Sequence, residues 1–339
     1  MVCNKILIFT ANIFLCILLV IAGCAKPAEK SVQTKVKFEE QKRTVKLALK
    51  FVPNDSTTYK VTTDADNSLT WESPDANKPK GFTGGHTGSK SEITFTQQIQ
   101  SIDDKGNAVV KITIEQLRYQ RTVKNEITMD FDSSRQQDQQ EPLSKLIGLS
   151  YTIEMTASGD VSKIIDANDA RAVVKGASTT DKMAASFLSD DAIMERHKVP
   201  ALPETDKNQL RAGNDWSIIK SFSFAMMGTK TYEKIYTLKE VEDVDNRRIA
   251  IAQMEAVPSA ERARELPEDQ TASFFANMSD NTETYTGELK LDLTNGKVEE
   301  YREKLNTEWL IVDPNPKEGE PPAALKMGAV RSYSIEKVD

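Results

Sequence analysis

The cysteines are the residues whose chemistry this sequence constrains most. All three lie within the first 24 residues: Cys3, Cys16 and Cys24. Lys5 gives the chain a positively charged start, an apolar run follows over residues 6–21, and small residues stand immediately before Cys24. This order is typical of a secretory signal peptide cleaved between Gly23 and Cys24. The run is also shorter than the ~20 apolar residues that a transmembrane helix needs.

The four residues Ile21-Ala22-Gly23-Cys24 resemble the lipobox of bacterial lipoproteins. The resemblance implies that Cys24 receives diacylglycerol, becomes the new N-terminus and carries three acyl chains. One chain anchors a protein weakly, and two or more hold it stably in a bilayer. Ala25 follows Cys24 where an Asp would retain such proteins at the inner membrane, so the outer membrane, on its periplasmic side, is favoured. The alternatives are a plain signal peptide and a single-pass anchor.

Removal of the signal peptide changes what the rest of the chain can do. It leaves 339 − 23 = 316 residues and, because Lys5 is lost, moves the net charge from −7 to −8. With Cys24 acylated, no thiol remains for a disulfide, a cysteine metal site or cysteine catalysis. An acidic chain also lacks the clustered Lys and Arg that bind nucleic acid, so no nucleic-acid partner is expected.

Residues 84–91, Gly-Gly-His-Thr-Gly-Ser-Lys-Ser, resemble a phosphate-binding P-loop in part. Such a loop needs Gly-x-x-x-x-Gly-Lys-Ser/Thr between a strand and a helix. Here Ser89 stands where the second glycine belongs, and residues 92–95 have the composition of a strand. A flexible loop between strands is therefore the interpretation, and no cofactor is expected.

Histidines and serines offer little else for catalysis. The two histidines, His86 and His197, are far apart and form no ligand-spaced pair, so both are interpreted as surface residues and no metal site is expected. No Gly-x-Ser-x-Gly motif occurs, which argues against the nucleophile of an α/β-hydrolase. We therefore assign no catalytic residue and expect a protein that is not an enzyme.

Acidic pairs are common, but none has the spacing of a calcium loop, which needs a central glycine and a closing glutamate. The pairs are Asp64/Asp66, Asp103/Asp104, Asp130/Asp132, Asp190/Asp191 and Asp243/Asp245. Asp103/Asp104 and Asp243/Asp245 are expected in hairpin turns, where Asp and Asn bond to their own backbone. Asp130/Asp132 alternate with apolar residues and are expected on a solvated strand face.

The elements that must position these residues are mainly strands. Residues 24–43 are polar and charged and are expected to form a flexible tether. Residues 44–339 are expected to form one β-rich domain, with possible halves at 44–165 and 213–339, because apolar residues alternate with polar ones there. Short helices are predicted over 166–175 and 181–198. The predicted fold class is mainly β, as a curved antiparallel sheet, a half-barrel or a sandwich.

The individual strand predictions follow the alternating apolar residues. They include a first strand over 45–51, strands near 59–61 and 69–71, and a Gly/Pro-rich loop over 74–90. An insertion with some helical character is expected over 258–280, and a Pro/Glu-rich loop over 314–322. Residues 93–116 and 235–253 resemble each other weakly, which indicates either two related β-units or the ordinary likeness of strands joined by polar turns.

A set of aromatic and methionine side chains could either line an apolar pocket or fill the core, and the core is favoured for most. The set is Trp71, Trp216, Trp309, Met226, Met227 and Met254.

Several features in order resemble a family of bacterial lipoproteins of unknown function. After the lipobox come residues 51–55 (Phe-Val-Pro-Asn-Asp), 146–149 (Leu-Ile-Gly-Leu), 159–161 (Gly-Asp-Val), 213–216 (Gly-Asn-Asp-Trp) and a strand and turn over 287–296. The resemblance is one of pattern and implies no activity. The predicted fold is also similar to that of periplasmic lipoprotein carriers, in which a half-barrel covers an apolar cavity.

These observations predict a non-enzymatic lipoprotein of the cell envelope, anchored in the bilayer through Cys24, whose domain binds an apolar ligand or lipid. The alternative is an envelope scaffold that binds other proteins through strand edges or loops. An enzyme is the least favoured because the sequence contains no recognisable catalytic set.

Overall fold

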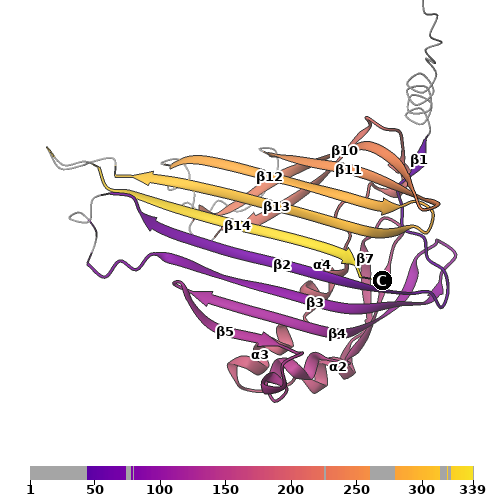
Figure 1. Cartoon of the computed structure of the whole chain (residues 1–339), viewed down its shortest axis with the longest axis horizontal. Coiled ribbons are helices and arrows are strands. Elements are labelled where there is room, and N and C mark those ends of the chain that lie inside the picture. Colours follow the sequence, from indigo (N-terminus) through magenta and orange to yellow (C-terminus); the bar gives the residue numbers. More distant parts are fainter. Residues whose placement is uncertain are drawn as a thin grey trace, which may run out of the picture. The chain divides into compact units, whose positions relative to one another are not determined.

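A 12-stranded antiparallel sheet makes up most of the structure, a computed structural model that describes residues 44–73, 78, 80–224, 227–259, 279–313, 319 and 322–338. Eleven strands follow one another in the order β7-β6-β4-β3-β2-β14-β13-β12-β11-β10-β9, and β5 pairs with β4. Figure 1 shows β12, β13, β14, β2, β3 and β4 side by side in this order. The expectation of a curved, mainly β fold with short helices is confirmed. One large sheet, rather than two facing sheets, favours the half-barrel over the sandwich.

The strands of this sheet are long, and most neighbours in sequence are joined as hairpins. They are β2 (Ser56–Trp71), β3 (Gly85–Ile102), β4 (Ala108–Val123), β5 (Glu126–Asp132), β6 (Ser150–Met155), β7 (Val161–Asp166), β9 (Asp215–Ser223), β10 (Thr229–Val244), β11 (Arg247–Pro258), β12 (Ser279–Asp292), β13 (Lys297–Val312) and β14 (Ala324–Lys337). The last strand, β14, pairs with β2 and so joins the two halves in one sheet.

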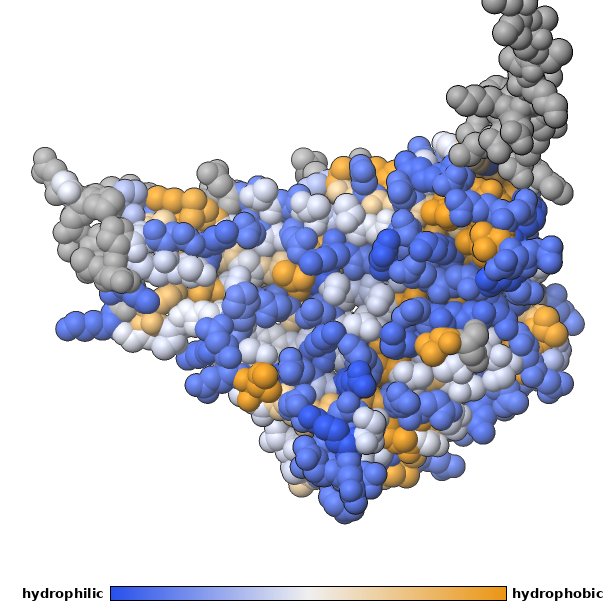
Figure 2. Space-filling model, viewed as in Figure 1, coloured by the Kyte–Doolittle hydropathy of each residue, from blue (hydrophilic) through white to orange (hydrophobic). Residues whose placement is uncertain are grey.

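The two faces of the sheet differ because side chains alternate along each strand. In β13, Tyr301, Leu305 and Trp309 are at most 3% exposed and point to one face, which we call the inner face. Their neighbours Arg302, Lys304 and Glu308 are exposed. The surface seen in Figure 2 is mainly hydrophilic, with hydrophobic residues in small separate patches. The sheet therefore has one packed face and one wet face, as the alternation predicts.

The first strand is shorter than predicted. β1 is only Val45–Lys46 and pairs with β8 (Gln209–Leu210) in a separate two-stranded sheet. Leu47 and Leu49 are buried, but their backbone N–H groups donate to Asn208 and Ala157, at 2.9 and 2.8 Å. The alternation therefore identified buried positions correctly, while the backbone bonds to loops instead of extending a sheet.

Three short helices lie between the two halves, as predicted: α2 (Asn168–Val173), α3 (Thr179–Ser186) and α4 (Asp190–His197). Serines start the last two, since Ser178 Oγ accepts from the backbone N–H of Asp181 and Ser189 Oγ from that of Ala192. Asp181 also accepts from Ser178 N, which completes a capping box. Single turns of 3-10 helix occur at Gln136–Asp138, Pro142–Leu146 and Thr205–Lys207.

Gly159 fixes the approach of the segment after α4. This glycine has φ +82° in the turn between β6 and β7, and its carbonyl accepts from Val199 N at 2.8 Å. A Cβ there would lie 2.7 Å from the Cβ of Val199. The turn therefore needs glycine both for its backbone angle and for close packing.

The predicted loop over residues 74–90 is wrong in part, because β3 begins at Gly85. Gly85–Lys90 pair with β2 residues Asp64–Leu69, so this glycine-rich stretch is extended strand rather than loop. Gly88 fits there because a Cβ would lie 2.4 Å from the carbonyl oxygen of Ala65. Close backbone approach accounts for a glycine that looked like a loop signal.

Several predictions fall outside the described residues: the signal peptide (1–23), acylated Cys24, the tether (24–43), most of the insertion (258–280) and most of the loop over 314–322. The described residues belong to one compact unit, residues 41–339. Within the described ranges, no helix has both the length and the apolar character needed to cross a membrane.

Candidate functional site

The last turn of α4 and the segment that follows it are held against the inner face by side chains from three strands. Trp216 Nε1 donates to Ala201 O at 3.0 Å, Tyr236 Oη donates to Pro200 O at 2.9 Å, and Tyr333 Oη donates to Arg196 O at 3.1 Å. These side chains belong to β9, β10 and β14, and β14 is far from the helices in sequence. Their side chains therefore fix where α4 crosses the sheet.

A cleft of about 320 Å³ lies between the end of α3, α4 and the inner face, and we call it the α4 cleft. The sheet contributes side chains of β2, β3 and β14, and the helical layer contributes the α3–α4 junction. The lining residues are Val61, Thr63, Ser91, Ile93 and Tyr333 from the sheet, with Ser186, Phe187, Ala192, Glu195 and Arg196 opposite.

The sheet wall of the α4 cleft changes character along its strands. Val61 pairs with Ile93, and both are buried; two residues further along, Thr63 pairs with Ser91. The Oγ1 of Thr63 lies 2.7 Å from the Oγ of Ser91. Since two strand residues span about 6.6 Å, an apolar strip and a hydroxyl strip lie side by side. This arrangement suits a ligand with apolar and polar parts.

Arg196 is the charged group of the α4 cleft that is withdrawn from water. The residue is 6% exposed. Its Nη1 donates to Tyr151 Oη at 3.0 Å, and its Nη2 donates to the carbonyl of Phe187 at 2.7 Å. Both acceptors are neutral, and within the described parts of the chain no carboxylate pairs with this guanidinium.

His197 is buried, so its interpretation as a surface residue is wrong. It is 2% exposed, its ring packs edge-on against Phe95 at 4.5 Å, and its Nε2 lies 2.6 Å from Tyr151 Oη. Burial, and then the charge of Arg196, hold the pKa of His197 well below its usual value of 6.5. The error arises because His197 follows the buried Ile193 by four residues and so lies on the same, inward face of α4.

His86 lies at the surface, as predicted. Its side chain is 62% exposed, and its Nδ1 is 2.7 Å from Asp66 Oδ2. The two histidines belong to different regions, β3 for His86 and the end of α4 for His197. Among the described residues, no group of three or more His, Cys, Asp or Glu has a metal-binding arrangement.

A buried ion pair occupies the other half of the inner face. Lys234 Nζ lies 2.9 Å from Glu303 Oε2, with side chains 0% and 8% exposed. Tyr301 Oη also donates to Glu303, at 2.5 Å, and Lys234 donates to Pro200 O at 3.1 Å. Burial lowers the pKa of Lys234, and the carboxylate of Glu303 acts against that shift. The sequence analysis missed this pair and Arg196.

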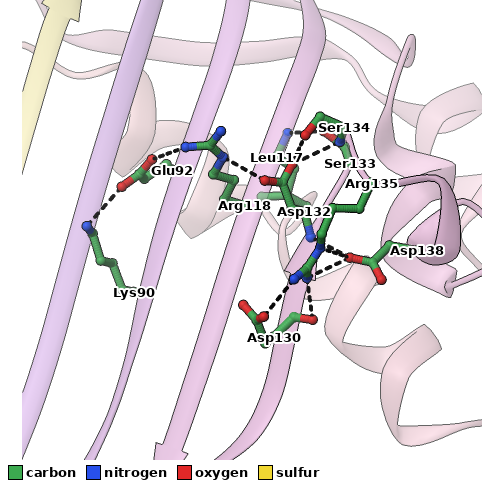
Figure 3. A network of polar contacts seen from close by, with 10 residues as sticks. All are labelled: Lys90, Glu92, Leu117, Arg118, Asp130, Asp132, Ser133, Ser134, Arg135 and Asp138. Carbon is green, nitrogen blue, oxygen red and sulfur yellow. Dashed lines mark hydrogen bonds and ion pairs between the residues drawn. The ribbon is translucent and has the colours of Figure 1, made fainter.

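Acidic pairs take most of the structural roles expected of them, but Asp243, expected in a hairpin turn, lies in strand β10 and pairs with Arg248 of β11. Asp103 Oδ1 accepts from the backbone N–H groups of Lys105 and Asn107 in a hairpin turn, and Asp245 has φ +49° in another. Figure 3 shows Asp130 and Asp132 in a network of ion pairs with Arg135 and Arg118. The Nε of Arg118 lies 2.9 Å from Asp132, and its side chain is 62% exposed.

Most of the aromatic and methionine side chains belong to the core, as favoured. Trp216, Trp309, Met227 and Met254 are at most 9% exposed. Trp71 is partly buried near the far end of β2, with its ring 5.9 Å from that of Phe82. Met226 lies outside the described residues. The apolar part of the α4 cleft instead comes from Val61, Ile93 and Phe187, which the sequence did not single out.

Comparisons with known proteins give little for identification. No family model matches the chain, and no curated protein matches it. A solved structure titled "Lipid-protein interactions in lipovitellin" is similar with a TM-score of 0.41 and 11% identity, over 86% of this chain and 26% of that one. This chain thus spans about a quarter of that protein's length, and a likeness at this level carries no argument about function.

Proposed function

We propose that the β-rich domain is a non-enzymatic binding module for an apolar ligand, held in the α4 cleft. The observation that carries the proposal is the cleft itself, about 320 Å³ in volume, with Val61, Ile93 and Phe187 in its walls. Pockets that hold small molecules are about 300–1,000 Å³ and mainly apolar, with a few polar groups that orient the ligand. The α4 cleft has this size, and its walls combine apolar side chains with polar ones.

The polar groups of the cleft support binding rather than catalysis. Glu195 pairs with Lys220 at 2.7 Å, and the hydroxyls of Thr63 and Ser91 bond to each other. Catalysis by a nucleophile requires a neighbouring base within hydrogen-bond reach. The carboxylate of Glu195 is instead engaged by Lys220, and the two hydroxyls have each other as partners, which suits recognition of a ligand.

We also propose that Cys24 is acylated and anchors the chain in the cell envelope, at the outer membrane. The support is the sequence, in which Cys24 follows small residues at the end of an apolar run. Labelled palmitate fed to cells that express the chain is expected to enter the wild-type protein but not Cys24→Ala. Labelling of Cys24→Ala at the wild-type level would contradict the proposal.

Ligand binding can be tested on the full-length chain by photo-crosslinking with a diazirine-labelled fatty acid and mapping of the labelled peptides. We expect label on peptides from β2, β3 and the α3–α4 junction. Ala192→Phe should block it, because Ala192 lines the cleft. Ala185→Phe is the matched control, since Ala185 is exposed on α3 and lies outside the lining. Equal labelling of the two variants would refute the site.

A second candidate function is a protein scaffold, and the edge strand β9 favours it. Within the described sheet, β9 pairs only with β10, and Ile219 on this strand is 38% exposed. A free edge can accept a strand from a partner. Cross-links from β9 to another protein, together with an absence of ligand label in the α4 cleft, would make this function the leading one.

A further inference from the structure

Among the described residues, no anion compensates the charge of Arg196, whereas the buried cation of Lys234 is paired with Glu303. A buried cation is normally paired, because transfer of an isolated charge out of water is unfavourable. Arg196 is 6% exposed, and its acceptors in the described part of the chain are a phenol oxygen and a main-chain carbonyl. Such neutral acceptors orient a guanidinium without neutralising it.

Arg171 provides an internal comparison for Arg196. Both arginines donate to carbonyls of the same α3–α4 junction, Arg171 to Leu188 at 2.8 Å and Arg196 to Phe187 at 2.7 Å. Arg171 also pairs with Asp190, and its side chain is 34% exposed. Support of the junction therefore does not require an unpaired charge, and the more buried arginine is the one without an acid.

We propose that the α4 cleft binds a single-chain amphiphile whose anionic head, a carboxylate or a phosphate, pairs with Arg196. This inference rests on the proposed function, because it names the class of ligand for the same cleft. The guanidinium presents several donors in a fixed fork, which matches both kinds of oxyanion. The apolar chain contacts Val61, Ile93 and Phe187.

The remaining polar groups of the cleft are consistent with an anionic head. Thr63 and Ser91 are hydroxyl donors that can turn from each other to a ligand oxygen. Glu195 also lines the cleft, but its carboxylate is 65% exposed and is compensated by Lys220. Tyr333 Oη donates to the backbone carbonyls of Arg196 and Lys198, and these hydrogen bonds hold the backbone of Arg196 in place.

The test uses the full-length chain in a neutral detergent and three photoactivatable probes with the same alkyl chain. Their head groups are a carboxylate, a phosphate and an alcohol, and labelling is measured at neutral pH. We expect the anionic probes to label the α4 cleft more strongly than the alcohol. Arg196→Gln should lower labelling by the anionic probes about tenfold to a hundredfold and leave the alcohol unchanged.

Three further variants keep the result interpretable. Arg171→Gln should behave as wild type, and Arg196→Lys should keep the preference for anions because it keeps the charge. If Arg196→Gln does not fold, the head-group preference of wild type and of Arg196→Lys still decides the question. Ala192→Phe should abolish labelling by all three probes.

The outcomes distinguish a failure of the anionic head group from a failure of the α4 cleft as a binding site. Preference for the carboxylate alone, or for the phosphate alone, supports the inference and identifies the head group. If all three probes label the cleft equally and Ala192→Phe removes this labelling, the cleft remains an apolar binding site and the proposal of an anionic head group is overturned. Absence of label in the cleft overturns both proposals. Full competition by inorganic phosphate at the probe concentration would overturn the requirement for an alkyl chain.

Discussion

The two halves of the inner face differ in whether their buried charges are paired. On the side of β10–β13, Lys234 pairs with Glu303 and Lys230 with Glu283. On the side of β2–β6, the acceptors of the Arg196 guanidinium within the described ranges are both neutral. The charges of the first half are thus paired with acids of the chain, whereas Arg196 has no paired acid among the described residues.

This difference separates structural polar groups from groups available to a ligand. The pair Lys234–Glu303 is enclosed by Tyr301 and by Pro200 O, so its hydrogen bonds are made within the fold. Glu303 also adjoins a cavity but is paired, whereas Arg196 lines the α4 cleft of about 320 Å³ and has no paired carboxylate among the described residues. A buried charge is therefore informative about function when it is both unpaired and adjacent to space.

The largest effect is expected where the paired half is broken. Glu303→Leu leaves the cation of Lys234 buried and unpaired, and removal of one partner of a buried pair costs about 3–5 kcal/mol. Urea denaturation should show this loss. The double variant Lys234→Met with Glu303→Leu should recover most of it, because apolar side chains of similar volume replace both charges. A loss below about 1 kcal/mol in Glu303→Leu would show that the pair is not enclosed.

The next largest effect is a pH dependence at the end of α4. The pKa of His197 in the folded state lies well below 6.5, so the unfolded chain takes up a proton at a higher pH than the folded chain. The stability should therefore fall as the pH drops below about 6.5, by about 1.4 kcal/mol per pH unit, until the folded-state pKa is reached.

The control for this pH dependence is a variant that cannot titrate at position 197. His197→Phe should flatten the profile between neutral pH and the onset of carboxylate titration. Denaturation midpoints across the pH range give the measurement. The same slope in wild type and His197→Phe would mean that His197 titrates normally in the fold.

The sequence predicted the repetitive parts of this structure and missed the tertiary ones. Alternation located the strands because a sheet with one wet face imposes it. It failed for residues 47–49, which are buried at the right spacing but bond to loops, and for Gly85–Lys90, where glycines serve close strand approach. Local pattern does not distinguish these cases from ordinary strands and loops.

The candidate site left only a faint signal in the sequence. In β10, Lys234 stands between Tyr232 and Tyr236 at the spacing of the buried face, and in β13 Glu303 stands between Tyr301 and Leu305. A charge at an apolar position of a strand indicates a buried pair. Arg196 gave no such signal, because its burial depends on how α4 crosses strands that are distant in sequence.

A smaller effect on stability is expected when the unpaired charge is removed. Arg196→Met relieves the desolvation of the guanidinium but loses two hydrogen bonds to neutral acceptors, and these contributions oppose each other. We expect a change within about 1 kcal/mol by urea denaturation, well below that of Glu303→Leu. A loss above about 3 kcal/mol would show that Arg196 is as structural as Lys234, and the comparison between the two halves would fail.

The smallest effect is expected on the wet face, where Arg118 and Asp132 pair in the network of Figure 3. Arg118 is 62% exposed there, so water and salt screen its charge, and a double-mutant cycle with Arg118→Ala and Asp132→Ala should give about 0–1 kcal/mol. The coupling should shrink further at high salt. Lys234 and Glu303 are withdrawn from solvent, so their coupling should be larger and nearly independent of salt. Similar coupling and salt dependence for the two pairs would mean that burial on the inner face does not set the strength of its ion pairs.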